Sequence, residues 1–393
     1  MKRIFLYSIF VLSLCLAYAL KRPCQIHSWG GEERFENSNL CYNDIQALYE
    51  LRGLNQRKIP YVEARPYEYP PLIASQMYLT SWASKDNVQF FYANLWVNSL
   101  WLLLSLLVLE TLQPNRKKLF YFAGVPTLVL YAFFNWDASS VLLLCLSMYF
   151  YEGKKEGGAA CCAAMAFAGK LFPVLCLIPM ALAAKNDFVR LKKIVLGALL
   201  GFAVFYLPLI VASIVQLGNF GLVTSIFQFH AKRLPEFATF WHWTSGIFGY
   251  SPFEDGYRVF VERVSAFLMI AGVLLVSLSK NKKRTIWTQS GALVALLLLV
   301  SKIYSPQYAL WLLPFFVLNS TSWKAIFAFL VGDLWGFIAI FTWFAVTGKP
   351  DEVYWKYQLQ WAVLFRSSIL FYLFLSWGFF PKRSVLLKKT GMK

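Results

Sequence analysis

The sequence predicts an all-α integral membrane protein, and its composition, its apolar runs and the placement of its charges each support that fold class. Of the 393 residues, 58% are hydrophobic and only 15% are charged, whereas about a quarter of the residues in a soluble domain are charged. The apolar runs are continuous, as in membrane-spanning helices, and lack the two-residue alternation of barrel strands. Because backbone groups in lipid must be hydrogen-bonded internally, we expect a helical bundle in a bilayer.

The formal net charge of +18 could also indicate a nucleic-acid-binding protein, because basic patches bind phosphate backbones. The basic residues, however, fall in short clusters between the apolar runs, as the positive-inside rule predicts for cytoplasmic loops. We therefore expect membrane lipids, and no nucleic acid, as the partners of this charge.

The first apolar run, 4–20, follows Lys2 and Arg3. Its small residues near position 19 fit a signal-peptide cleavage site, but the run is longer than a signal peptide usually needs. We expect a retained first span that starts inside the cell, with cleavage of the segment as the alternative.

The next segment, 21–87, is polar and contains basic and acidic residues in equal number, so it lacks the basic bias of an inside loop. We expect this long loop outside, with short interfacial helices such as 45–54. A second outer loop is expected at 214–257, and a basic cytoplasmic tail at 381–393.

Apolar runs and basic clusters alternate along the rest of the chain. Several runs are shorter than the ~20 residues that cross a bilayer unaided, so their boundaries are approximate. We predict one polytopic domain, 1–393, in the cell membrane, with both termini cytoplasmic and about twelve spans: 4–20, 88–112, 119–134, 138–151, 157–169, 171–184, 194–213, 259–279, 286–303, 308–318, 325–346 and 363–380.

Cys24 and Cys41 are the cysteines of the first outer loop, while the others lie in apolar runs. The outer side of a membrane is oxidising, which favours a disulfide between them. Two free thiols are the alternative.

Asp44 places a carboxylate in the outer loop, shortly beyond the first span. Sugar transfer by single displacement needs a base that takes the proton of the acceptor hydroxyl. Partial desolvation above a lipid-lined cleft would raise the pKa of a carboxylate toward the working range. The alternative is a helix cap, because Asp44 precedes a segment that reads as the start of a helix.

Basic residues also lie on the outer side. His230, Lys232 and Arg233 fall in the second outer loop, and Lys170 and Lys302 fall near the outer ends of predicted spans. A departing phosphate needs cations to stabilise it. Ordinary attraction to lipid head groups, worth roughly 1 kcal/mol per basic residue, is the alternative.

Other motifs are missing from the sequence. It has no phosphate-cradling glycine loop, no clustered His and Cys metal spacing and no nucleophile elbow. It also lacks the internal repeat that marks many secondary transporters. We therefore expect no metal and no other cofactor. Asp333 lies inside a predicted span, and we assign it no chemistry.

Four stretches together resemble the polyprenyl-phosphate-sugar-dependent glycosyltransferases of family 87, within the GT-C fold group. The last stretch is the most specific, and the order and the predicted topology also match, so the resemblance covers most of the chain. The stretches are 41–45 (CYNDI) with 52–54 and 60–61, 68–72 (EYPPL), 170–173 (KLFP), and 302–308 (KIYSPQY) with 310–314 (LWLLP).

The resemblance implies an inverting transferase of the cell envelope that is metal-independent or weakly metal-dependent. Its donor would be a polyprenyl-phosphate-linked sugar, often mannose, and its acceptor a lipid or a glycan. The proposed base of the family falls on Asp44, and its outer-loop histidine and arginine fall on His230 and Arg233, directly before a departure from the family pattern at 234–236. The predicted substrate-binding residues are Glu68, Asp137, Lys170, His230, Arg233, Lys302 and Gln307.

Two other functions fit the same features. A transporter or flippase of lipid-linked sugars would need a path through the membrane midplane, whereas the polar residues here gather at one face. A non-catalytic scaffold of envelope assembly would keep the fold without turnover.

Overall fold

The computed structural model of the chain describes residues 2–26, 35–63, 67–279, 281 and 283–381. In these residues the regular elements are α-helices and short 3-10 helices, as the composition predicts. Residues 382–393 of the predicted basic tail lie outside the described part of the chain.

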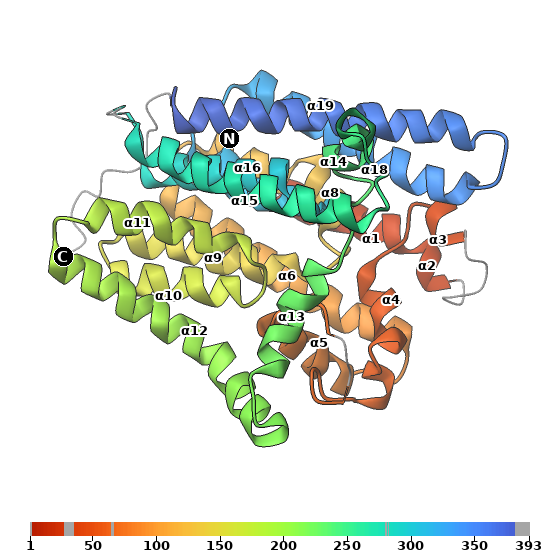
Figure 1. The fold of residues 1–393 in the computed structure, drawn as a ribbon, viewed down its shortest axis with the longest axis horizontal. Helices are drawn as coiled ribbons and strands as arrows, with labels where there is room; N and C mark the ends of the chain where they lie inside the picture. Colours follow the sequence, from red (N-terminus) through yellow and green to blue (C-terminus); the bar gives the residue numbers. More distant parts are fainter. Residues whose placement is uncertain (1, 27–34, 64–66, 280, 282, 382–393) are drawn as a thin grey trace.

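Six of the described helices are long and apolar enough to cross a membrane, by length and composition. The prediction of a multi-pass, all-helical membrane protein is therefore confirmed. In Figure 1, α19 and α15 run across the upper part of the molecule, and α16 (Ile286–Val300) packs against both. The six helices are α1 (Arg3–Lys21), α6 (Asn87–Leu112), α12 (Phe188–Leu217), α15 (Asp255–Leu278), α18 (Trp323–Val346) and α19 (Glu352–Gly378).

Shorter helices fill the interior between the long ones. α9 (Asp137–Glu152) packs between α6 and α10 (Glu156–Phe167), and α10 packs on α12. The last pair approaches closely because glycines face each other. A Cβ on Gly197 would lie 2.0 Å from the carbonyl oxygen of Gly157, so only glycine fits there. Small residues of this kind let helix backbones meet in membranes.

Three of the predicted spans are interrupted rather than continuous. The run 119–134 forms α7 (Arg116–Ala123) and α8 (Pro126–Tyr131). Pro126 explains the break, because proline has no backbone N–H and restricts the residue before it. Likewise, 171–184 forms η2 (Phe172–Cys176) and α11 (Leu177–Ala184), and 308–318 forms η4 (Pro306–Leu312) and α17 (Leu313–Leu318), with proline in each first turn of η2, η4 and α17.

The predicted first outer loop contains several short helices, including the one expected at 45–54, which corresponds to α4. A disulfide joins Cys24 in α2 to Cys41, three residues before α4, with the two Cα atoms 5.7 Å apart. This bridge connects the end of the first span to the segment that carries Asp44. The short helices are α2 (Pro23–Ile26), α3 (Phe35–Ser38), α4 (Asp44–Leu51), η1 (Leu54–Gln56) and α5 (Pro71–Trp82).

The segment after α12 forms α13 (Gly221–Ala231), α14 (Phe240–Thr244) and η3 (Ser245–Phe248). α13 lies beside the predicted first outer loop (Figure 1), where the His230 ring contacts the backbone of Glu68. The two predicted outer loops are therefore adjacent in space, although 162 residues separate these two positions.

Candidate functional site

Two cavities meet at Asp44. The first, of about 590 Å³, is bordered by α4, α13, the 68–70 segment, the 170–172 turn and the 301–308 segment. The second, of about 540 Å³, lies between the 233–238 segment, α18 and the 304–306 turn. Four residues line both cavities: Tyr42, Asp44, Arg233 and Ser305.

Asp44 is the first residue of α4 and does not cap it. The cap is Asn43, whose backbone is extended and whose side chain accepts a hydrogen bond from the Gln46 backbone N–H at 2.9 Å. The helix-cap alternative for Asp44 is therefore wrong. Since its neighbour satisfies the helix end, the Asp44 carboxylate is left to face the cavities.

Besides Tyr42, two residues before it, the Asp44 carboxylate contacts side chains from other segments. Asn135 donates from Nδ2 to Asp44 Oδ2 at 2.6 Å and to Tyr69 Oη at 2.8 Å, and the Tyr69 hydroxyl lies 3.5 Å from the same carboxylate oxygen. Burial raises the pKa of Asp44 to about 6, although the Asn135 hydrogen bond and the Lys170 charge oppose this shift. A general base works best with a pKa near the operating pH.

Lys170 lies on the wall of the first cavity, held by a carboxylate and by aromatic rings. Its side-chain Nζ is 3.3 Å from Asp137 Oδ2, and it lies above the rings of Tyr69 and Tyr308, at 4.8 and 5.5 Å from their centroids. Trp311 fixes the other Asp137 oxygen by donating from Nε1 to Oδ1 at 2.6 Å. An ammonium has three donors, so Asp137 leaves others for a ligand.

Arg233 lies between the two cavities, paired with Glu236. The other oxygen of Glu236 accepts from the Tyr304 backbone N–H at 3.1 Å, and the Glu236 backbone N–H donates to the Lys302 carbonyl at 2.9 Å. The 234–236 segment, where the sequence departs from the family pattern, thus supplies the counter-ion of the arginine.

Lys302 also lines the first cavity, but its ammonium joins two helices. It donates to the Ala231 carbonyl at the end of α13 and pairs with Glu262 on α15. Arg258 contacts both of the same groups. Because Glu262 neutralises the Lys302 ammonium, the contacts of Lys302 serve to connect α13 to α15 as well as to place a cation on the cavity wall.

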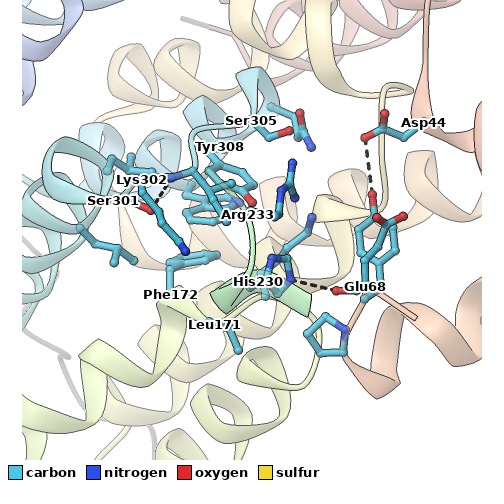
Figure 2. Close-up of a pocket in the computed structure, with 18 of the residues that line it drawn as sticks. Asp44, Glu68, Leu171, Phe172, His230, Arg233, Ser301, Lys302, Ser305 and Tyr308 are labelled. Atoms are coloured by element: carbon cyan, nitrogen blue, oxygen red, sulfur yellow. Dashed lines mark hydrogen bonds between the residues drawn. The ribbon is translucent and has the colours of Figure 1, made fainter. Parts of the chain in front are cut away.

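His230 and Glu68 border the first cavity together. The His230 Nε2 is 2.9 Å from the Glu68 carbonyl, which can only accept, so this nitrogen carries the proton. Burial lowers the pKa of His230 to about 4, so the ring is neutral at pH 7. Figure 2 shows this contact, with Arg233 between Lys302 and Asp44 in the view. The Glu68 carboxylate pairs with Arg52 at 3.0 Å.

Gln307 completes the predicted set. It is buried, it lines the first cavity, and its Oε1 has no hydrogen-bond partner among the described residues. An unpaired buried acceptor favours a ligand that brings an O–H or N–H donor.

All of the predicted substrate-binding residues except Asp137 line the first cavity, and Asp137 contacts Lys170 at its wall. Sequence reasoning missed two of the side chains that contact the Asp44 carboxylate, namely Asn135 and Tyr69. The signal for Asn135 was its place beside Asp137, between two apolar runs. In the described part of the chain, no group of three or more His, Cys, Asp or Glu side chains is placed to hold a metal ion.

No family model and no curated protein matches this chain. Among solved structures, the chain is similar to the crystal structure of ArnT from Cupriavidus metallidurans bound to undecaprenyl phosphate. The TM-score is 0.48 and the sequence identity 11%, over 95% of this chain and 76% of that one. A likeness at this level assigns no family, and membership of family 87 stays a prediction.

Proposed function

We propose that this chain is a membrane glycosyltransferase. It would move a sugar, which we take to be mannose, from a polyprenyl-phosphate donor to a lipid or glycan acceptor on the outer face of the cell membrane. The observation that carries the proposal is the position of the Asp44 carboxylate, at the junction of a cavity that bears cations and a second, more apolar cavity. About twelve spans and two cytoplasmic termini belong to the same proposal.

The first cavity would hold the donor. Its phosphate would bind near Lys170 and Arg233, and its sugar would point toward Asp44. Both cations are paired with a carboxylate, Asp137 and Glu236 respectively. The phosphate would therefore share cations that are already positioned, which reduces the reorganisation needed when charge develops on the leaving group. The apolar lining of the cavity, with Leu171 and Phe227, would receive the start of the lipid chain.

The second cavity would admit the acceptor. For inversion, an acceptor hydroxyl that enters there would have to reach the sugar from the side opposite the phosphate. The oxygen forms a bond to the anomeric carbon while the carbon–oxygen bond to phosphate breaks. The electron pair of that bond goes to the phosphate, and the hydroxyl proton goes to the Asp44 carboxylate.

The test uses the purified full-length chain in liposomes with polyprenyl-phosphate mannose, radiolabelled in the sugar, and a lipid extract as the source of acceptor. A transferase releases polyprenyl phosphate and moves the label to a new product. A flippase moves intact donor between leaflets without releasing phosphate lipid, and that result would refute the proposal. The same assay on Asp44→Asn should show little transfer, because asparagine cannot take the hydroxyl proton. Asp86→Asn is the matched control for this variant: it is the same change in the same predicted loop but outside both cavities, and asparagine can replace Asp86 as the cap of α6.

A further inference from the structure

Lys21 is the last residue of α1, and its side chain is fully buried. Its Nζ donates to the Tyr42 carbonyl at 2.8 Å and lies 5.0 and 5.6 Å from the ring centroids of Phe134 and Phe337. Lysine is almost never fully buried unless its charge is compensated, so the groups around Lys21 indicate what its charge does.

Tyr42 connects Lys21 to Asp44. Its carbonyl accepts from the Lys21 ammonium, and its side chain hydrogen-bonds the Asp44 carboxylate. The disulfide between Cys24 and Cys41 joins the same two segments of the chain, the end of α1 and the residues before α4. The position of Asp44 relative to α1 is therefore fixed by a covalent bridge and by the hydrogen bond of a buried cation.

The charge of Lys21 also acts on the Asp44 carboxylate. A charge in the protein interior is costly unless an opposite charge compensates it, and the negative charge of Asp44 favours the ammonium form of Lys21. The interaction is mutual, so Lys21 favours the deprotonated form of Asp44, which is the form that a general base needs. Lys170 acts in the same direction and Glu68 in the opposite one. The charged or titratable groups around Asp44, besides Lys21, are Tyr42, Glu68, Tyr69, Lys170 and the Arg233–Glu236 pair.

From these contacts we infer that Lys21 is a positioning residue for the proposed base: its buried ammonium holds the segment that carries Asp44 and adds a positive charge near the carboxylate. This inference rests on the proposed function, because it concerns the same carboxylate. Lys21 lines neither cavity, whereas Lys170 lines the first. A donor phosphate would therefore engage Lys170 and leave the charge of Lys21 to act on Asp44.

The test measures the protonation of Asp44 without relying on turnover. Dicyclohexylcarbodiimide reacts with protonated carboxyl groups, and mass spectrometry of the peptide that contains Asp44 gives its labelling rate in the purified full-length chain as a function of pH. In Lys21→Met the midpoint of this profile should rise by about one pH unit, because a positive charge that favours the carboxylate is lost. Lys21→Arg keeps the charge and should keep the midpoint. Arg22→Met is the matched control: it removes the same charge one residue along, where the side chain is exposed and solvent screens it, so the midpoint should not move.

An unchanged midpoint in folded Lys21→Met would overturn the inference, as would an equal shift in Arg22→Met. If Lys21→Met does not fold, Lys21→Gln gives the same comparison, since it keeps a donor for the Tyr42 carbonyl but carries no charge. The acid limb of kcat/KM should move with the midpoint, whereas a purely structural role of Lys21 would lower kcat without moving that limb. A raised midpoint in Lys21→Met, together with no sugar transfer by the wild type, would support the interaction of Lys21 with Asp44 and count against the transferase.

Discussion

Replacing Asp44 by asparagine should abolish most turnover while leaving the fold nearly unchanged. The amide keeps the size of the side chain and an oxygen that can accept from Asn135, but it cannot take a proton. The cap of α4 is unaffected because Asn43 makes it, and the Asp44 backbone N–H still donates to the Phe134 carbonyl at 2.9 Å. The structural loss is confined to the hydrogen bonds of this carboxylate, which become neutral; the shortest of them, from Asn135, should account for about 1 kcal/mol.

The catalytic loss should be much larger. Removing a general base lowers the rate by about 10² to 10⁴, which corresponds to about 3 to 5 kcal/mol of transition-state stabilisation. The assay measures release of polyprenyl phosphate by purified Asp44→Asn and wild type, with thermal unfolding of each in the same detergent. More than about a tenth of wild-type turnover in a folded Asp44→Asn protein would refute Asp44 as the base. Loss of turnover together with a large fall in Tm would show a structural defect instead.

Three further predictions follow from the same geometry. Because the base acts in its deprotonated form and the pKa of Asp44 is raised to about 6, kcat/KM should fall as the pH drops below that value; a flat profile between pH 5 and 7 contradicts this. Lys170→Met should destabilise the protein by about 3 to 5 kcal/mol, since it leaves the buried Asp137 carboxylate without its cation. Adding Asp137→Asn to this variant should recover much of the lost Tm. If the Tm does not recover, loss of the Lys170–Asp137 pair is not the cause of the destabilisation. Cysteines placed at Asn219 and Lys155, which are exposed, should react with impermeant reagent from outside and inside respectively, and labelling from one side alone would break the proposed topology.

The fold class could be predicted from the sequence because only helices and closed barrels can span a lipid bilayer. A chain so rich in apolar residues must satisfy its backbone within helices, and each long helix of the structure overlaps an expected span. The interrupted spans could not be predicted in the same way. Hydropathy records that a run such as 119–134 is apolar, but Pro126 decides where its helix breaks, and packing against neighbouring helices decides whether a short helix is tolerated there.

The residues of the candidate site could be predicted from the sequence, but their ion pairing and protonation could not. Lys170, Arg233 and Lys302 do lie on one cavity, as their predicted outer positions indicated. Their counter-ions lie far away in the sequence or in a segment with no recognisable pattern, so sequence reasoning treated them as free cations. His230 is the clearest difference. It was expected beside the phosphate, but burial keeps it neutral at pH 7 and its Nε2 is bonded to the Glu68 carbonyl.

The placement of Arg233 shows why such a site needs the whole chain. Arg366 on α19 donates from Nη2 to the Ala238 carbonyl at 2.6 Å, and its guanidinium lies 3.7 Å from the centroid of the Tyr304 ring. The Tyr304 backbone in turn holds Glu236, the partner of Arg233. Arg366 thus contacts both segments that separate the two cavities, the 233–238 segment and the 304–306 turn. Its planar guanidinium can donate to the Ala238 carbonyl and stack on the Tyr304 ring at the same time, which a lysine ammonium could not do. The border between the two cavities is therefore set by packing between helices remote in sequence, and no local motif could have indicated it.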